Sequence, residues 1–319
     1  MLQIALVISA IILGLAVGNF TGGFKFYSAV CLAAGIFLVT PSLFKFKLAD
    51  FALIKSHSGA IIKNLWVNYL LLTSIALLIG YVSQDIGIAA ALFLLALLPG
   101  GGMVMMWIKV SGANVKLGFI IFMLNLALLL PIMVIFMQFN GVASPYFPAV
   151  DLSLVDYMAS SAQVSPMGPF MLLIVIPFII SRIVLKFFPS IVDFTAKHQS
   201  LISKITMFGI VFYLFSLSTS QLLFEVSLVD LAKAAVATLA FYAAVFIVAI
   251  KLTKKTPDDK AVFWHIATRY ITLALILAVF NVDTYGATFI LPIMFAYFIQ
   301  ISASGFLAKI EVEKPASKT

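Results

Sequence analysis

Apolar stretches long enough to cross a bilayer follow one another along nearly the whole chain. A hydrocarbon core about 30 Å thick takes roughly 20 apolar residues per helical crossing, so a chain of 319 residues has room for about ten crossings. Hydrophobic residues make up 63% of the chain and charged residues 10%, against about 25% charged in soluble proteins. This composition predicts an all-α polytopic membrane protein. It excludes a soluble enzyme, a disulfide scaffold, a nucleic-acid-binding protein and a disordered chain.

A polar gap at residues 138–165 divides the apolar segments into two sets of five. The gap holds prolines and aspartates but no Lys or Arg. We expect a first five-helix repeat over residues 1–138, an extracytoplasmic linker over 139–165, a second five-helix repeat over 166–308 and a cytoplasmic tail over 309–319. The expected spans are 2–17, 26–44, 60–82, 86–110, 115–137, 167–188, 201–222, 228–250, 261–280 and 284–308. The first lacks a basic leader, so we expect it to be retained and not cleaved as a signal peptide.

Basic residues gather in alternate loops, as the positive-inside rule requires of a correctly divided chain. They follow the even-numbered spans: Lys45, Lys47, Lys55, Lys109, Lys116, Arg182, Lys186, Lys197, Lys204, Lys251, Lys254, Lys255, Lys260, Lys309, Lys314 and Lys318. The other loops carry Asp85, Asp151, Asp156, Glu225 and Asp283, with Lys25 and Lys233 as basic exceptions. We therefore predict both termini on the cytoplasmic side of a bacterial or archaeal cytoplasmic membrane. The formal charge of +8 reflects this bias and not an affinity for nucleic acid.

An odd number of spans in each half makes the two halves enter the membrane from opposite sides. Such inverted repeats are common in secondary transporters, which bind substrate near the midplane where interrupted helices meet. The stretch Leu98–Gly102, with the sequence Leu-Pro-Gly-Gly-Gly, interrupts the fourth span about midway. The ninth span has no Gly or Pro and instead carries a polar patch, His265, Thr268, Arg269, Tyr270 and Thr272. These two stretches are the predicted substrate site.

Pro99, Gly100, Gly101 and Gly102 free backbone groups that lipid cannot satisfy, so this stretch should face protein or a water-filled cavity. The half-helix that begins near Met103 would present N–H donors and the positive end of its dipole to an anion. The alternative is that the glycines only let helices pack closely.

Arg269 is the sharpest single signal for function. It lies about nine residues, roughly 13 Å, inside the ninth span, where an arginine costs at least about 2.5 kcal/mol. Every Asp and Glu lies in a loop, at the end of a span or in the tail, and none is in the middle of a span. The guanidinium must therefore be satisfied by backbone carbonyls at the break, by Tyr270, or by an anionic substrate. A purely structural arginine, or one that extends to the cytoplasmic face, is the alternative.

Other polar residues within the apolar runs are weaker candidates. His265 precedes Arg269 by four residues and is expected to share its helical face, which suggests a proton-coupling role together with Thr268 and Thr272. An interfacial position is the alternative for His265. Asn68 and Asn125 are either substrate ligands or hydrogen-bonding residues between helices. We expect no metal and no cofactor, since Cys31 is the single cysteine and Met103, Met105 and Met106 are expected to pack.

Over most of its length the chain resembles the bile acid:sodium symporter family and its relatives, the arsenite efflux permeases. Pro99-Gly100-Gly101 and Asn114-Val115 are similar to the fourth-span motif of the symporters. Met103–Trp107, Asn125 and Ile176-Pro177 look more like the arsenite branch. The resemblance implies about ten helices in a panel and a core domain, with helices four and nine discontinuous and crossing at their unwound centres.

The chain departs from both branches at positions that bind ligands in those families. Val104-Met105 stand where sodium-coupled members have Ser-Asn, and the Glu-x-x-x-Gln-Asn pattern of their ninth span falls on His265, Arg269 and Tyr270. Gly100 stands where the arsenite branch has a cysteine. We infer that the Arg269 guanidinium takes the place of the sodium ion bound by the relatives.

The sequence therefore predicts a secondary transporter of a small organic anion, which works by alternating access and is driven by protons or by exchange. The predicted substrate-binding residues are Arg269, Pro99, Gly100, Gly101, Gly102, Tyr270, Asn68 and Asn125, with His265, Thr268 and Thr272 as coupling residues. The alternatives are a sodium-coupled symporter of bile-acid-like or other organic anions and an arsenite-permease-like efflux carrier. An intramembrane enzyme is disfavoured, because the spans hold no acid/base pair or metal cluster. A ligand sensor is disfavoured because sensors usually carry a soluble output domain, for which we expect the tail after Ala308 to be too short.

Overall fold

The computed structural model describes residues 2–34, 36–37, 40–44, 53–101, 103–150, 152, 154, 171 and 175–313. Within these ranges the chain is helical, with no β-strand and two isolated β-bridges. Five helices are long and apolar enough to cross a membrane, and they lie at Ile4–Thr21, Ser58–Ser83, Leu129–Tyr146, Leu228–Leu252 and Ala287–Leu307. The helical membrane protein predicted from composition is confirmed at this level. Of the residues used to predict topology, Lys45, Lys47, Asp151, Asp156, Lys314 and Lys318 lie outside these ranges.

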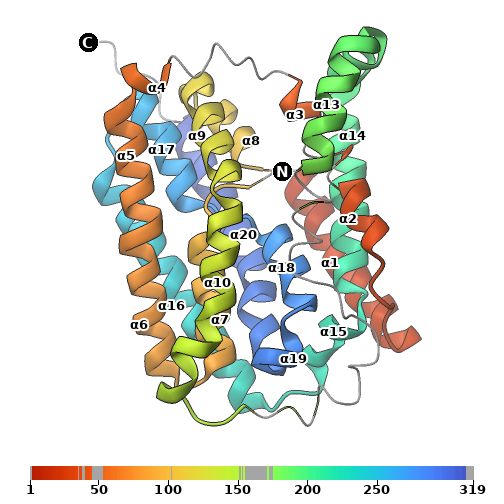
Figure 1. Cartoon of the computed structure of the whole chain (residues 1–319), viewed down its shortest axis with the longest axis vertical. Coiled ribbons are helices and arrows are strands. Elements are labelled where there is room, and N and C mark those ends of the chain that lie inside the picture. The colour runs from red at the N-terminus through yellow and green to blue at the C-terminus, as the bar shows by residue number, and fades with distance from the viewer. Residues whose placement is uncertain are drawn as a thin grey trace.

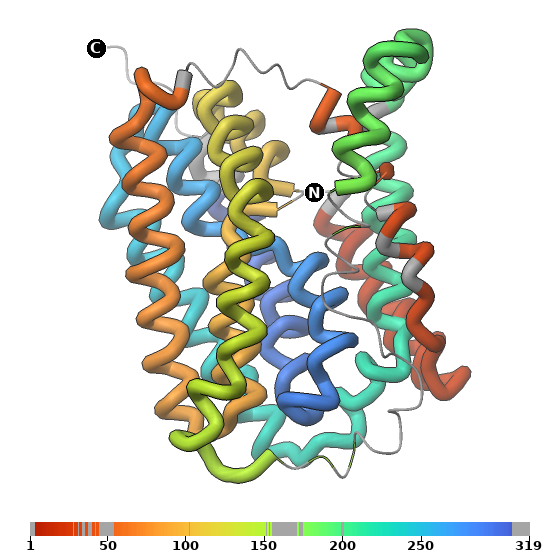
Figure 2. The backbone as a smooth tube through the Cα atoms, in the orientation of Figure 1, coloured from red at the N-terminus to blue at the C-terminus, as the bar shows by residue number. Residues whose placement is uncertain are grey.

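Most helices gather in a larger body on the left and in the centre of Figures 1 and 2. One long helix is made of α5 (Ser58–Trp66), the π-helical η3 (Val67–Leu72) and α6 (Thr73–Ser83), and α6 packs against α16 (Leu228–Leu252). This body also contains α9 (Val115–Ala127), α10 (Leu129–Ala143) and α20 (Ile290–Glu313), together with the two interrupted helices described below. α10 thus runs past the predicted repeat boundary at residue 138, and α20 runs into the predicted tail.

A smaller body lies on the right of both figures. Its helices are α1 (Leu2–Thr21), α2 (Ser28–Ala34), α3 (Thr40–Leu43), α13 (Ile176–Phe187), α14 (Pro189–Phe215) and α15 (Ser218–Gln221). α1 packs along α14, where a side chain at Gly14 would collide with the carbonyl of Phe212. The loop after α1 is fixed to α14 by hydrogen bonds from Phe24 N to Ser216 O (2.8 Å) and from the Tyr213 hydroxyl to Lys25 O (2.9 Å). The loop and α14 therefore form one unit.

Two interrupted helices enter the larger body from its opposite ends (Figure 1). One consists of α7 (Ile86–Leu97) and α8 (Val104–Val110), and the other of α17 (Pro257–Ala267) and α18 (Ile271–Val279). Asp85 caps α7 by accepting from Ile88 N at 3.0 Å, and Thr256 caps α17 by accepting from Asp259 N at 3.2 Å. Because the caps fix both outer ends, the two helices begin regularly and lose their helical form only near the centre.

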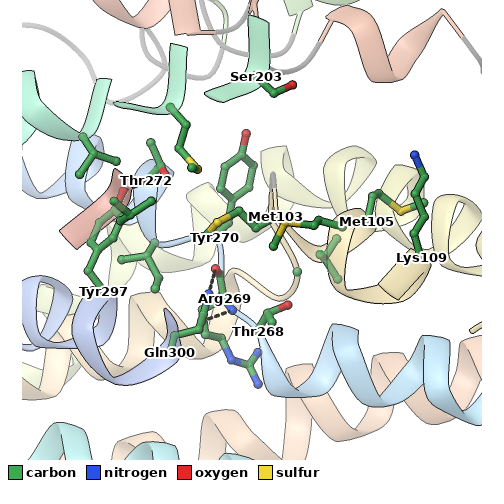
Figure 3. Close-up of a pocket in the computed structure, with 18 of the residues that line it drawn as sticks. Met103, Met105, Lys109, Ser203, Thr268, Arg269, Tyr270, Thr272, Tyr297 and Gln300 are labelled. Carbon is green, nitrogen blue, oxygen red and sulfur yellow. Dashed lines mark hydrogen bonds between the residues drawn. The ribbon is translucent and has the colours of Figure 1, made fainter. Parts of the chain in front are cut away.

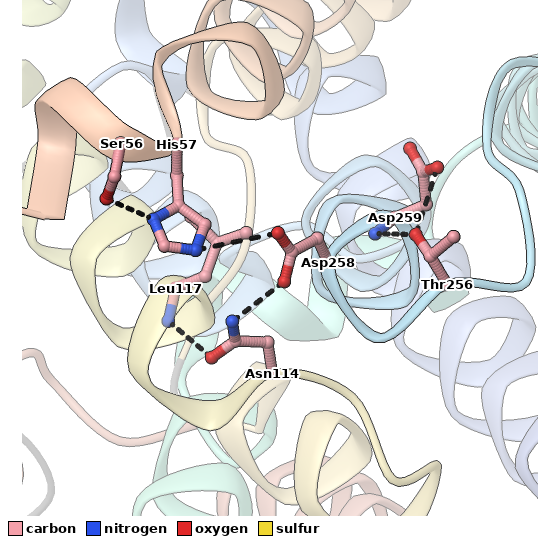
Figure 4. A network of polar contacts seen from close by, with 7 residues as sticks. All are labelled: Ser56, His57, Asn114, Leu117, Thr256, Asp258 and Asp259. Carbon is pink, nitrogen blue, oxygen red and sulfur yellow. Dashed lines mark hydrogen bonds and ion pairs between the residues drawn. The ribbon is translucent and has the colours of Figure 1, made fainter.

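We call the end of the molecule formed by the start of α5, the α8–α9 turn and the start of α17 the lysine-rich end. It carries Lys63, Lys109, Lys116, Lys254, Lys255 and Lys260. A polar network fastens its three elements together (Figure 4). Asn114 Nδ2 donates to Asp258 Oδ1 at 2.7 Å, and the other Asp258 oxygen lies 3.5 Å from His57 Nε2. Asn114 also caps α9 through Leu117 N, so one side chain connects α9 to α17.

The Lys63–Asp259 ion pair joins α5 to α17 at this end, with Nζ 2.6 Å from Oδ1. Burial raises the pKa of Asp259, but the hydrogen bond and the charge of Lys63 outweigh burial, so the pKa is lowered overall. A carboxyl whose pKa is lowered in the folded state adds stability that is present above the unfolded pKa of about 3.9. That stability is lost as the pH falls through the folded value.

We expect Lys63→Met to lower the melting temperature of the detergent-solubilised protein by about 1–2 °C at pH 7, since a partly exposed ion pair contributes at most about 1 kcal/mol. The difference from the parent should persist down to the unfolded pKa of about 3.9 and shrink as the pH falls further, because Asp259 is then protonated through its lowered pKa. Lys116→Met, which removes an exposed lysine of the same end, is the matched control and should leave the melting temperature unchanged. A pH-independent difference would contradict this account.

Candidate functional site

The centres of the two interrupted helices cross and pair through their backbones. Pro99 and Arg269 form an antiparallel bridge, in which Gly100 N donates to Thr268 O and Tyr270 N donates to Leu98 O, both at 2.8 Å. Gly101 has a φ of +132°, and a Cβ there would lie 3.0 Å from Tyr270 Cα. Glycine is therefore required here both for the backbone conformation and for the close approach of the two chains.

Gln300 of α20 holds the other side of the Arg269 peptide groups. Its Oε1 accepts from Arg269 N at 2.6 Å and its Nε2 donates to Arg269 O at 3.2 Å. The same Oε1 accepts from the Tyr242 hydroxyl at 3.0 Å. This buried amide replaces the partners that Arg269 would have in a helix, which is why the ninth predicted span is interrupted without Gly or Pro.

The Arg269 guanidinium points away from the side chains of Met103, Tyr270 and Ser203 (Figure 3). The residue is 2% exposed. Nη1 donates to Asn68 Oδ1 at 2.8 Å and to Ala96 O at 3.3 Å, and Nη2 donates to Ile266 O at 2.7 Å. As predicted, backbone carbonyls near the break accept from the guanidinium. The Asn68 amide oxygen is a further partner that was not predicted, and Tyr270 is not a partner. No ion pair within the described ranges includes Arg269.

His265 does not share a helical face with Arg269, because α17 ends at Ala267, before Arg269 is reached. The fully buried imidazole instead contacts α9. Its Nε2 donates to Gly118 O at 2.8 Å, and its Nδ1 lies 3.5 Å from the Asn125 amide nitrogen. Asn125 Oδ1 accepts from the Tyr69 hydroxyl at 3.4 Å. These contacts fit a neutral imidazole with the proton on Nε2. The imidazole faces the interior of the larger body.

A cavity of about 510 Å³ lies between the crossing and α8 on one side and α14 and α1 on the other (Figure 3). Its lining includes the expected site residues Gly100, Gly101, Thr268, Arg269, Tyr270 and Thr272. Pro99, Asn68, Asn125 and His265 do not line it, and Gly102 lies outside the described ranges. Because Lys109, Val110 and Lys197 line the cavity and are exposed, it reaches the surface at the lysine-rich end.

The chemistry of the lining is apolar with a few polar groups. Thr272 Oγ1 accepts from the Tyr297 hydroxyl at 2.8 Å, and Thr268 Oγ1 donates to Trp264 O at 2.6 Å. The Tyr270 hydroxyl forms no hydrogen bond with any residue in the described part of the chain. Four methionines line the walls, Met103, Met105, Met106 and Met207, and no described lining residue is acidic. The lining thus suits an organic anion better than a cation.

The half-helix after the break offers fewer free N–H groups than the sequence suggested. α8 has only seven residues, Val104 N already donates to Gly101 O at 3.0 Å, and Met106 N already donates to Met103 O at 3.0 Å. Lys109 and Lys197 were evident in the sequence only as markers of topology, and Met207 and Tyr297 were not predicted to belong to the site. Their apolar or loop surroundings gave no signal that they share a cavity.

At the end opposite the lysine-rich one, aromatic rings bring the two bodies into contact. Phe26, from the loop after α1, meets Phe280 at the end of α18 edge to face, with ring centroids 5.0 Å apart. Tyr213 of α14 lies behind Phe26 at 6.5 Å. A cavity thus opens between the bodies at one end, and this aromatic contact joins them at the other.

No protein-family model matches the chain, and no curated protein matches it. The resemblance to the symporter and arsenite families therefore stays a prediction. Within the described ranges, no group of three or more His, Cys, Asp or Glu side chains is placed to hold a metal ion.

We expect Gln300→Leu to destabilise the protein strongly. The change removes the partners of two buried backbone groups and of the Tyr242 hydroxyl, and each such buried group costs about 1–3 kcal/mol when left unpaired. Thermal unfolding of the detergent-solubilised protein measures the effect. Gln138→Leu, on an exposed face of α10, is the control and should leave the melting temperature within about 1 °C of the parent's. An equal effect of the two substitutions would show that the amide of Gln300 does not hold the break.

Proposed function

We propose that the protein is a secondary transporter of small organic anions that works by alternating access. The observation that carries the proposal is the cavity between the two bodies, which opens at the lysine-rich end, together with the contact of Phe26 and Phe280 that joins the bodies at the opposite end. Rocking of the bodies about the crossing would close the first end and separate Phe26 from Phe280 at the second. A ligand bound beside the crossing would then be exposed to the opposite side of the membrane.

The membership of the two bodies supports an inverted repeat of ten spans. The smaller body contains helices of the expected spans one, two, six and seven, and the larger body contains those of spans three to five and eight to ten. Each body thus takes equivalent spans from both halves, as a panel and a core domain related by inverted repeats do. Under this proposal the lysine-rich end is cytoplasmic, in agreement with the positive-inside rule.

Arg269 acts in this proposal as a built-in cation. Its guanidinium is surrounded by the oxygens of Asn68, Ala96 and Ile266, and unwound backbone carbonyls of this kind bind coupling cations in other transporters. The positive charge is covalently attached, so no sodium ion is needed at this position. It contributes a positive potential beneath the cavity while the substrate contacts the opposite side of the crossing.

Cross-linking tests the alternating-access proposal directly. In a Cys31→Ser background, which removes the only cysteine, Phe26→Cys and Phe280→Cys are joined by a short bifunctional thiol reagent. We expect the linked protein to lose anion uptake in proteoliposomes, because its two bodies cannot separate at that end. Anions should still stabilise it from the lysine-rich side in a thermal-shift assay. Treating each single-cysteine variant with the reagent is the control, and uptake at the parent rate after linking would refute the proposal.

A second experiment tests the built-in cation. Arg269→Gln leaves several buried oxygens without a donor, so the variant should be less stable than the parent in sodium-free buffer. We expect sodium to restore part of that stability and of the transport, and choline not to, whereas the parent should be insensitive to the exchange of sodium for choline. A variant that sodium does not help, or a parent that requires sodium, would contradict this role of the guanidinium.

A further inference from the structure

Two lysines from different bodies line the cavity. Lys109 is near the end of α8 in the larger body, and Lys197 is on α14 in the smaller body. Figure 3 shows Lys109 extending from α8 toward the side on which Ser203 of α14 lies. Unlike Lys63 and Lys233, which pair with aspartates, neither lysine forms an ion pair or hydrogen bond with another described residue. Their charges are therefore available to a ligand in the cavity.

The rest of the cavity lining indicates the chemistry of the part of a ligand that would lie between the two lysines. Methionine side chains cover the wall of α8 and part of α14, while the Tyr270 hydroxyl and Ser203 provide polar groups. No described lining residue is an Asp or Glu that would compensate the lysines. A ligand that satisfies this lining carries an acidic group at each end and a short apolar carbon chain between them.

We propose that Lys109 and Lys197 bind the two carboxylates of a short dicarboxylate and so draw the two bodies together; this inference rests on the proposed transport function. Lys109 and Lys197 place two like charges in the lining of the empty cavity, one on each body, and their repulsion opposes closure of the gap between the bodies. A dicarboxylate neutralises both lysines, whereas a monocarboxylate leaves one uncompensated. The loaded carrier therefore closes readily and the empty carrier slowly, which makes the protein an exchanger of dicarboxylates.

The binding test compares succinate with butyrate, which has the same number of carbons and one carboxylate fewer. Thermal shifts of the purified protein in detergent should give succinate an affinity at least tenfold higher than that of butyrate. Lys109→Gln and Lys197→Gln should each remove this preference. Lys116→Gln and Lys204→Gln remove lysines near the same helices but outside the cavity lining, and they should bind both probes like the parent.

The transport test uses proteoliposomes that are empty or preloaded with succinate. Uptake of labelled succinate should be at least tenfold faster into the loaded vesicles, and the two cavity variants should lose most of this stimulation. High salt should reduce it as well, because the Debye length is only about 8 Å at physiological ionic strength and about 3 Å at 1 M. Equal uptake into empty and loaded vesicles would overturn the exchange mechanism.

The outcomes separate this inference from the proposed function. If succinate and butyrate bind equally and the lysine variants bind like the parent, the dicarboxylate site is wrong while anion transport stands. If neither probe binds and neither is transported, both proposals fail. Lys197→Glu gives an independent check, because its carboxylate would pair with Lys109. That variant should melt at a higher temperature than the parent without ligand and should no longer respond to succinate, and an unchanged response would also overturn the site.

Discussion

The pairing of two interrupted helices through their own peptide groups is the interaction on which the rest of the structure depends. Four backbone groups near Pro99 and Arg269 would be left without partners if either helix were displaced. In a membrane interior, water is not available to replace them, so the crossing is stable only as a whole. The buried guanidinium adds to this requirement, because its hydrogen bonds reach both interrupted helices and the π-helical turn.

Much of the architecture is visible in the sequence because membrane helices are specified locally. The apolar runs, the polar gap and the alternation of lysines required no knowledge of distant contacts. The break at Pro99 is likewise local, since proline and glycine carry their conformational preferences with them. The structure confirms a helical membrane protein with five described helices long and apolar enough to cross a membrane, whereas the ten spans and their repeat stay a prediction.

The second break could be recognised only as a polar patch, because its cause lies elsewhere in the chain. The chain leaves the helical conformation at Thr268–Tyr270 because Gln300, some thirty residues away, completes the hydrogen bonding of the Arg269 peptide groups. The end of α17 at Ala267 also explains why the helical spacing between His265 and Arg269 gave the wrong face. Lys109 and residues of α14 line one cavity only because of how the two bodies pack together, and no local sequence pattern encodes that packing.

The π-helical turn at Val67–Leu72 has a consequence for how one helix serves several neighbours. A turn of this kind contains an extra residue, which rotates everything beyond it by about 100° relative to a regular α-helix. The segment before the turn packs on α17, while the segment after it packs on α7 and α16. One inserted residue thus lets a single helix turn differently oriented packing faces toward its neighbours before and after the π-helical turn. Asn68 lies within that turn. Deleting one residue from the turn would rotate the whole of α6 (Thr73–Ser83) away from the helices against which it packs.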